Sequence, residues 1–341
     1  MLSAMHLAVD MYCAVLFFGF ISGGRSAWQA MVLYNACAFA GQAPIGAAAD
    51  RLKNGLAVAA AGFILLAGAW FLNSAPIACA VIAGLGNGAF HAGAGYSVLM
   101  GDTERASALG VFVSTGAIGL YCGTVDASVY AKYGWIFAVV FVVFAAGLLY
   151  YSLGKRFASR LPERSCGLEP SLDMPRGGIW ALIPLVTVVV MRAFIGSTEC
   201  FSIPDMPGSA AVLCVAGGKA LGGFLMDGVG AKRASVASLL PCAVMVLFGT
   251  RLAAGQVTRL LALLLFNMTM PITLFAAARL LKGAKGFAFG LLTFGLFVGY
   301  IPKFMGINTS PLPQYVYAVL IILSLALLIA GLKYERGHEE E

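Results

Sequence analysis

Apolar runs long enough to cross a lipid bilayer recur along the whole chain, and they restrict the fold more than any other feature. A helix of about 20 residues spans a hydrocarbon core of about 30 Å, and inside lipid every backbone polar group must be bonded within the protein. We therefore predict an all-α membrane protein with twelve transmembrane helices. Their expected ranges are 2–22, 28–49, 55–73, 76–100, 107–131, 134–153, 179–196, 209–226, 234–250, 257–281, 287–303 and 313–333.

The composition agrees with a membrane protein. Hydrophobic residues make up 60% of the 341 residues, charged residues make up 11%, and the mean hydropathy is +0.90. Most Lys and Arg of the expected loops lie on the side that also holds both termini, which predicts cytoplasmic termini in a bacterial inner membrane. The net charge of +7 mostly reflects these Lys and Arg residues of the cytoplasmic loops. We expect a monomer in the lipid bilayer and no nucleic-acid partner.

The chain lacks the motifs of the common enzyme classes. We find no Gly-rich phosphate loop, no metal-ligand cluster and no nucleophile motif with its partners. The eight cysteines include no CxxC spacing, so neither a disulfide framework nor a zinc site is expected. We predict no enzymatic activity, no cofactor and no bound metal.

A polar interruption divides the chain into equal parts. Residues 154–178 are rich in charge, Pro and Gly, and they separate six expected helices in 1–153 from six in 179–341. The second part ends in a short charged tail. Two six-helix bundles joined by a cytoplasmic linker are typical of transporters that arose by duplication.

A weak internal repeat supports this division. G-A-A-A-D-R-L-K-N-G begins at Gly46, and G-F-L-M-D-G-V-G-A-K-R begins at Gly223. The two glycines and the two aspartates, Asp50 and Asp227, are separated by the same interval. Each stretch follows an expected helix at the start of a cytoplasmic loop.

Both stretches resemble the G-x-x-x-D-[RK]-x-G-[RK]-[RK] loop of the major facilitator superfamily. Lys53 and Asn54 depart from this pattern in the first copy, and Gly228 departs from it in the second. The resemblance implies the twelve-helix major facilitator fold, and it implies that an Asp facing a neighbouring helix N-terminus helps to close the cytoplasmic face. The gating residues implied in this way are Asp50, Arg51, Asp227, Lys232 and Arg233.

Glycine pairs at small-xxx-small spacing mark helices that pack closely. In the superfamily, helices two, five, eight and eleven form the sliding contact between the halves, so we expect the pairs of helices five, eight and eleven to lie there. The alternative is ordinary tight packing of membrane helices. The pairs are Gly119/Gly123, Gly218/Gly222, Gly286/Gly290 and Gly295/Gly299.

Ionisable side chains inside the bilayer are the candidates for function, because each costs several kcal/mol unless it faces a cavity or a partner. Most polar candidates fall in helices one, four, seven and ten, which line the central cavity in the superfamily; Lys219 falls in helix eight. The candidates are His6, Asp10, Asn87, His91, Arg192, Lys219, Asn267 and Thr269.

A narrower resemblance rests on three segments. H-L-A-V-D, G-L-G-N-G-A-F-H and V-F-V-S-T-G-A-I-G are similar to the fosmidomycin-resistance-type branch of facilitators. That branch has a His and an Asp at this spacing in helix one, and its helix-four motif usually continues with Pro and an acidic residue. Here the continuation is A-G-A, so an identical coupling scheme or substrate does not follow.

His6 and Asp10 share one helical face because they lie four residues apart. Together with His91 they are the candidates for proton coupling, because a buried His and Asp can change protonation with the side of the membrane that wets them. A fixed hydrogen-bonded pair that packs helix one is the alternative for His6 and Asp10. For His91 the alternative is a bond to a backbone carbonyl.

Arg192 carries a permanent charge and must meet an anion, either a substrate group or Asp10. Its alternative is to extend toward the outer membrane surface. Lys219 invites the same substrate interpretation, with Asp126 as the alternative structural partner. Asn87, Asn267 and Thr269 complete the expected substrate-binding set.

The interpretation that unites these features is a secondary active transporter of a small organic, anionic or zwitterionic solute. Proton-coupled efflux is implied mainly by the resemblance. The alternatives are a proton-coupled uptake symporter, a uniporter, or a membrane receptor that kept the fold without transporting.

Overall fold

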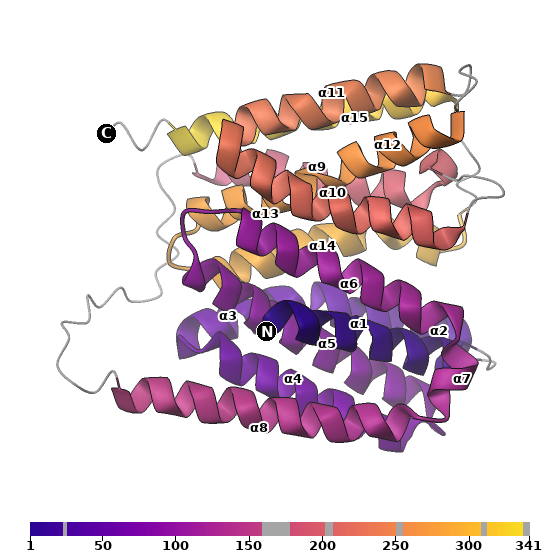
Figure 1. Ribbon diagram of the computed structural model, residues 1–341, viewed down its shortest axis with the longest axis vertical. Coiled ribbons are helices and arrows are strands. Elements are labelled where there is room, and N and C mark those ends of the chain that lie inside the picture. The colour runs from indigo at the N-terminus through magenta and orange to yellow at the C-terminus, as the bar shows by residue number, and fades with distance from the viewer. Residues whose placement is uncertain (23–25, 159–177, 202–206, 250–254, 308–311, 337–341) are drawn as a thin grey trace.

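The computed structural model describes residues 1–22, 26–158, 178–201, 207–249, 255–307 and 312–336, and these residues are mostly helical (Figure 1). Each of the twelve expected spans corresponds to one helix or one broken helix in this part of the chain, which confirms the predicted fold class. Ten spans contain one long helix: α1 (Leu2–Leu16, extended by a π-helical turn Phe17–Ile21), α4 (Gly55–Ala69), α5 (Pro76–Gly101), α6 (Ser107–Val125), α8 (Gly134–Ala158), α9 (Gly178–Ser197), α10 (Gly208–Val229), α11 (Ala231–Phe248), α14 (Lys285–Phe304) and α15 (Gln314–Arg336).

The second span, expected over 28–49, is broken near its middle. Its first part, α2 (Ala27–Asn35), continues into a π-helical turn, Ala36–Ala40, and α3 (Gln42–Leu52) begins after Gly41. A Cβ atom at Gly41 would overlap the carbonyl oxygen of Cys37, so this tight turn requires glycine. Among the described residues, eleven of the spans are long and apolar enough to cross a membrane, and this broken segment is the twelfth.

The tenth span is also broken, where the sequence predicts a continuous helix over 257–281. α12 (Gly255–Asn267) ends before Met268, and α13 (Thr269–Leu280) follows directly. Pro271 explains the break, because it has no N–H for the carbonyl of Asn267 and its ring crowds that group. The fifth span, expected as one helix over 107–131, is interrupted as well, since α6 ends at Val125 and a short helix, α7 (Ala127–Ala131), completes it.

The helices form two groups that lie side by side along the long axis of the molecule. Figure 1 shows α1 to α8, in indigo to magenta, on one side and α9 to α15, in red to yellow, on the other. We call residues 1–153 the first half and residues 179–341 the second half. Residues 159–177, which contain most of the expected linker, lie outside the described residues, so the division at 154–178 stays a prediction.

The two halves meet mainly along α6 with α10 and along α3 with α14. Gly46 of α3 packs directly on Gly286 of α14. Gly110 of α6 lies against the backbone of Lys219 and close to Gly223 of α10. Small residues therefore allow close approach at both contacts, and the two repeat glycines lie at these interfaces.

Most of the predicted glycine pairs pack inside one half instead, which corrects the expectation for them. Gly286 and Gly290 contact α3 of the first half. The others face helices of their own half: Gly119 and Gly123 face α1, Gly218 and Gly222 face the α12–α13 segment, and Gly295 and Gly299 face α9. The reason is that a small-xxx-small motif marks close approach without specifying the partner helix.

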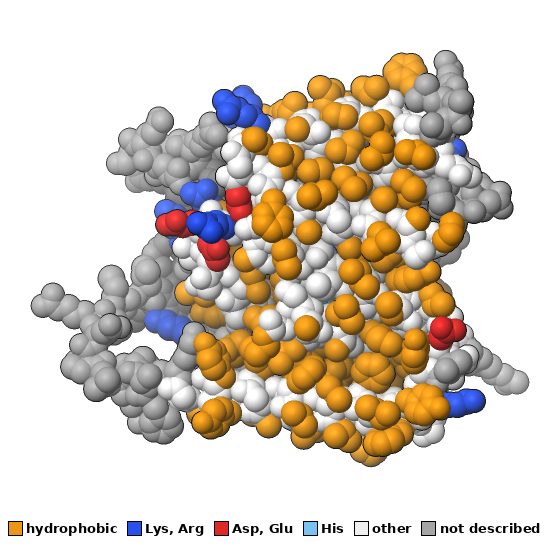
Figure 2. All heavy atoms as spheres, in the orientation of Figure 1, with side chains coloured by type: hydrophobic (Ala, Val, Ile, Leu, Met, Phe, Trp, Pro, Cys, Tyr) orange, Lys and Arg blue, Asp and Glu red, His pale blue; other side chains and the backbone are white. Residues whose placement is uncertain are grey.

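The surface has the polarity of an integral membrane protein. Figure 2 shows a wide apolar band, with charged side chains gathered at the two ends of the bundle. Large apolar side chains such as Phe71, Val143 and Leu213 are exposed on the helices, as lipid contact requires. We call the end at which α3 ends and α4, α9 and α14 begin the linker end, and the opposite end the far end.

Candidate functional site

The first half places three ionisable side chains in contact inside the bundle. His6 and Asp10 lie one turn apart on α1, and His91 reaches them from α5. The Nε2 atom of His6 lies 3.2 Å from Oδ2 of Asp10, and the Nε2 atom of His91 lies 3.4 Å from Oδ1. The two Nε2 atoms are 2.8 Å apart. We call these three residues the histidine–aspartate cluster.

Backbone carbonyls hold both imidazole rings from the opposite side. Nδ1 of His6 lies 2.7 Å from the carbonyl oxygen of Phe112 on α6, and Nδ1 of His91 lies 2.9 Å from that of Asn87. His91 therefore has the carbonyl contact expected of a structural histidine and the contacts with Asp10 and His6 as well. The two interpretations of His91 do not exclude each other.

Gly116 of α6 lies directly beneath the cluster. A Cβ atom at this position would overlap both Oδ2 of Asp10 and Nε2 of His6. Only glycine lets α6 come this close to α1. Gly116 was not among the predicted site residues, although it belongs to the V-F-V-S-T-G-A-I-G segment.

The cluster also has the composition of a metal site, which the sequence did not lead us to expect. One ligand-type atom from each of the three residues lies within 4.8 Å of the others. Two imidazole nitrogens bound to one tetrahedral Zn²⁺ are separated by about 3.3 Å, because each Zn–N bond is about 2.0–2.1 Å long. The 2.8 Å separation here is shorter and matches a hydrogen bond better.

Asn87 lies beside the cluster rather than in it. Its side-chain amide donates to the hydroxyl of Tyr34, at 3.0 Å, and approaches Sγ of Cys13, at 3.3 Å. Asn87 thus connects α5 to α1 and α2. Its predicted substrate contact stays a prediction.

The second half builds a different polar site around Arg192. Its guanidinium donates to Oδ1 of Asn267, at 2.8 Å, and to Oγ1 of Thr269, at 3.1 Å, and it lies over the ring of Phe266, at 5.6 Å. The break in the tenth span brings these residues together, since Asn267 and Thr269 flank it. We call Arg192, Asn267 and Thr269 the arginine cluster.

The structure corrects one alternative for Arg192. Its side chain does not extend to the outer surface, because the residue is only 8% exposed and bonds to α12 and α13. Among the described residues, Arg192 forms no ion pair with a carboxylate, and Asp10 is paired with the two histidines instead.

Lys219 lies half-buried near the middle of α10. Its charge interacts with those of Arg192 and Asp10. The alternative partner, Asp126, is exposed at the end of α6 and forms no ion pair with Lys219 in the described part of the chain. The long separation along α6 and α10 explains this, because Asp126 lies near the far end.

Two aspartates join the halves at the linker end. The carboxylate of Asp50 accepts hydrogen bonds from the backbone N–H groups of Gly286 and Phe287, both at 2.8 Å, where α14 begins. The carboxylate of Asp227 accepts bonds from Ala106, at 2.7 Å, and Ser107, at 3.0 Å, where α6 begins. Each half thus supplies one carboxylate to a helix N-terminus of the other half, which favours negative charge.

The basic residues of the two loops do not take part in these contacts. Arg51, Lys232 and Arg233 are exposed, and none forms a hydrogen bond or ion pair in the described part of the chain. Lys285, which the sequence did not single out, donates to the carbonyl oxygen of Leu99 at 3.0 Å. This bond joins the halves at the linker end in addition to the two aspartate contacts. At the far end the indole N–H of Trp28 on α2 donates to the carbonyl of Phe304 on α14, at 2.6 Å.

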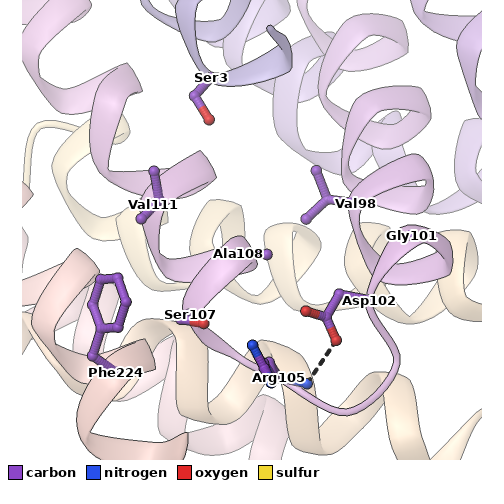
Figure 3. A pocket seen from close by; sticks show the side chains of 9 residues that line it. All are labelled: Ser3, Val98, Gly101, Asp102, Arg105, Ser107, Ala108, Val111 and Phe224. Atoms are coloured by element: carbon purple, nitrogen blue, oxygen red, sulfur yellow. Dashed lines mark hydrogen bonds between the residues drawn. The ribbon is translucent and has the colours of Figure 1, made fainter.

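A pocket of about 540 Å³ opens at the linker end beside the Asp227 contact (Figure 3). Ser3 of α1, Val98 of α5, Val111 of α6 and Phe224 of α10 line it, so it lies between the halves. Asp102 shapes its rim by accepting a hydrogen bond from the backbone of Arg105, at 2.9 Å. The pocket is separate from the two clusters.

Neither a protein-family model nor a curated protein sequence matches this chain. Solved structures with the same fold do match. The human organic anion transporter MFSD10 (TETRAN) has a TM-score of 0.69 at 16% identity, covering 96% of this chain and 98% of that one. The major facilitator superfamily transporter FucP in the outward conformation gives 0.63 at 14% identity, covering 96% and 98%.

A variant of the E. coli fucose:proton symporter FucP gives a TM-score of 0.62 at 14% identity, covering 97% of both chains. These similarities span nearly the full length of the chain. The architecture is therefore that of the major facilitator superfamily transporters.

Proposed function

We propose that this chain is a secondary active transporter of the major facilitator superfamily that moves a small organic, anionic or zwitterionic solute by alternating access. Proton-coupled efflux is the mode we favour, with the linker end in the cytoplasm. The fosmidomycin-resistance-type branch remains the proposed relationship within the superfamily.

The observation that carries this proposal is the buried charge of Arg192. A guanidinium inside a bilayer requires an anion, and none of the described carboxylates pairs with it. Two neutral oxygen acceptors hold the group in place without neutralising it. A carboxylate or phosphate of the solute would supply the missing charge, with Lys219 as a second cation nearby.

The contacts between the halves support an alternating mechanism. We assign gating to Asp50 and Asp227, which hold the linker end closed through two backbone N–H groups each. Opening this end breaks four hydrogen bonds to two charged acceptors, so the closed state is favoured until another contribution offsets them. Arg51, Lys232 and Arg233 are free to act in the open state.

The histidine–aspartate cluster supports coupling to protons. Its two imidazoles and one carboxylate lie in contact inside the first half, and the charge of Lys219 on the second half acts on Asp10. One protein of the same fold is named a fucose:proton symporter and another an organic anion transporter. The fold is thus compatible with both the coupling ion and the substrate class proposed here.

Three alternatives share the same architecture. A proton-coupled uptake symporter or a uniporter would use the same gates and the same arginine cluster. A non-transporting receptor would bind the solute without moving it, and substrate-driven flux in liposomes separates it from any transporter.

The first experiment is a thermal-stability screen of the detergent-purified protein against organic anions, amphiphilic cations and neutral metabolites. We expect an organic anion to raise the melting temperature of the wild type and of Arg105→Ala, an exposed arginine that serves as the matched control, but not of Arg192→Ala. The stabilising anion should then drive flux in liposomes. Stabilisation by cations or neutral compounds alone would contradict the substrate class, and Asp10 would become the leading contact.

A further inference from the structure

His6 and His91 contact each other through the Nε2 atoms of their two rings, and this contact requires a proton between them. The rings are perpendicular, with centroids 4.5 Å apart, and their Nε2 atoms lie 2.8 Å from each other. At this distance a hydrogen must lie between the two nitrogens, because two lone pairs would repel.

The opposite ring nitrogens determine where that hydrogen comes from. A backbone carbonyl can only accept a hydrogen bond, so Nδ1 of His6 and Nδ1 of His91 must both carry a proton to bond to Phe112 and Asn87. A neutral imidazole has one N–H, which leaves each Nε2 with a lone pair. The Nε2 contact therefore needs one proton more than two neutral rings possess.

We propose that His6 and His91 share a single proton between their Nε2 atoms, and that Asp10 stays ionised beside it as the counter-ion. The shared proton deepens the proposed function, and its role in transport rests on that function. The carboxylate oxygens, at 3.2 Å and 3.4 Å from the same two nitrogens, face the shared positive charge without a hydrogen of their own. The proton-loaded cluster is neutral overall, as a site inside a bilayer should be.

The charged and titratable groups around the cluster determine how the protein responds to loss of the proton. Cys13 of α1 and Tyr34 of α2 are its other titratable neighbours, and Lys219 of α10 is the cation of the second half whose charge acts on Asp10. Loss of the proton leaves a net negative charge, two opposed lone pairs and an unbalanced carboxylate. Lys219 is then attracted toward Asp10 across the interface between the halves. The proton state of the first half thus sets the attraction between α10 and the first half.

The chain allows a direct test because it contains only three histidines. We would label the histidine rings with ¹⁵N and record NMR spectra of wild-type protein and of His338→Gln, which leaves only the two cluster rings. We expect both Nε2 signals to shift together over one pH range, with both Nδ1 nitrogens protonated throughout and a scalar coupling between the two Nε2 nuclei. Independent titration of the rings, or protonation of the Asp10 carboxyl in their place, would overturn the proposal.

Substitutions in the wild-type chain separate the carrier from the counter-ion. His91→Gln should remove the coupling and leave His6 to titrate alone, whereas Asp10→Asn should keep the coupling and release the proton at least one pH unit lower, which is about tenfold weaker binding. His338 in these samples is the reference histidine. An unchanged His6 titration in His91→Gln, or an unchanged midpoint in Asp10→Asn, would contradict the assignment.

These measurements do not depend on transport. A shared proton without solute flux in liposomes would leave the inference standing and remove the proposed function. Solute flux in a protein whose rings titrate independently would overturn the inference and leave the proposed function standing.

Discussion

The two halves of this protein hold their buried charges in opposite ways. The histidine–aspartate cluster of the first half brings two rings and one carboxylate into mutual contact, so that the proposed shared proton would balance the carboxylate within the cluster. The arginine cluster of the second half surrounds a permanent cation with neutral oxygens and leaves its charge unbalanced. The first arrangement is suited to gaining and losing a proton, and the second to receiving an anion from outside. Substitutions in each half can break or sharpen this contrast, and their expected effects range from loss of transport to a shift in conformation.

Asp10→Asn should abolish gradient-driven transport while leaving solute binding intact. The substitution removes the only carboxylate of the first-half cluster, and the arginine cluster is unchanged. The measurement is solute flux in liposomes under an imposed pH gradient, together with the anion-induced thermal shift in detergent. Unchanged gradient-driven flux in the variant would exclude Asp10 from coupling.

Gly116→Ala should destabilise the protein by about 1–3 kcal/mol, because the added methyl group overpacks the contact between α6 and the cluster. Gly147→Ala is the matched control, since a Cβ atom there meets nothing within 4 Å. Thermal unfolding in detergent compares the two variants. Equal stabilities would show that α6 does not lie against Asp10 and His6.

Arg192→Lys should weaken anion binding by about tenfold or somewhat more. Lysine keeps the charge but cannot reproduce the two-pronged contact with Asn267 and Thr269, and one hydrogen bond to a charged group is worth about 1.5–3 kcal/mol. Binding isotherms of the anion found in the stability screen measure the difference. Complete loss with lysine would mean that geometry outweighs charge in this cluster.

Asp50→Asn and Asp227→Asn should each shift the protein severalfold toward states open at the linker end. Asparagine keeps an acceptor but loses the charge that favours a helix N-terminus, an effect of about 1 kcal/mol. Labelling of a cysteine introduced at Ala108, inside the linker-end pocket, should rise, and labelling of Ser209→Cys at the far end should not. Equal labelling with and without the aspartates would argue against gating at these contacts.

The sequence predicted the membrane architecture well and the contacts between distant segments less well. Hydropathy alone predicted the twelve spans, and the four-residue spacing predicted that His6 and Asp10 share a face. The position of His91 followed from a resemblance. Neither the sequence patterns nor the resemblance could indicate that Gly116 supports the cluster or that Lys285 reaches Leu99, because such contacts depend on how helices far apart in the sequence pack together.

The same limit explains the incorrect expectations. Apolar periodicity continues through the tenth span, so the break at Met268 could be read only from Pro271, which many membrane helices tolerate. Opposite charge was the basis for pairing Lys219 with Asp126. In the structure Asp126 follows the last residue of α6 near the far end, whereas Lys219 lies near the middle of α10.

The aspartate contacts at the linker end pair one side chain with main-chain groups. The N–H groups that Asp50 and Asp227 bind belong to positions 286, 287, 106 and 107, and any amino acid except proline supplies that donor. Sequence drift at positions 106, 107 and 287 would therefore leave the hydrogen bonds intact, whereas position 286 needs glycine because a Cβ atom there would overlap Gly46. A search for co-varying residue pairs would find no partner for either aspartate, although each is bonded across the interface.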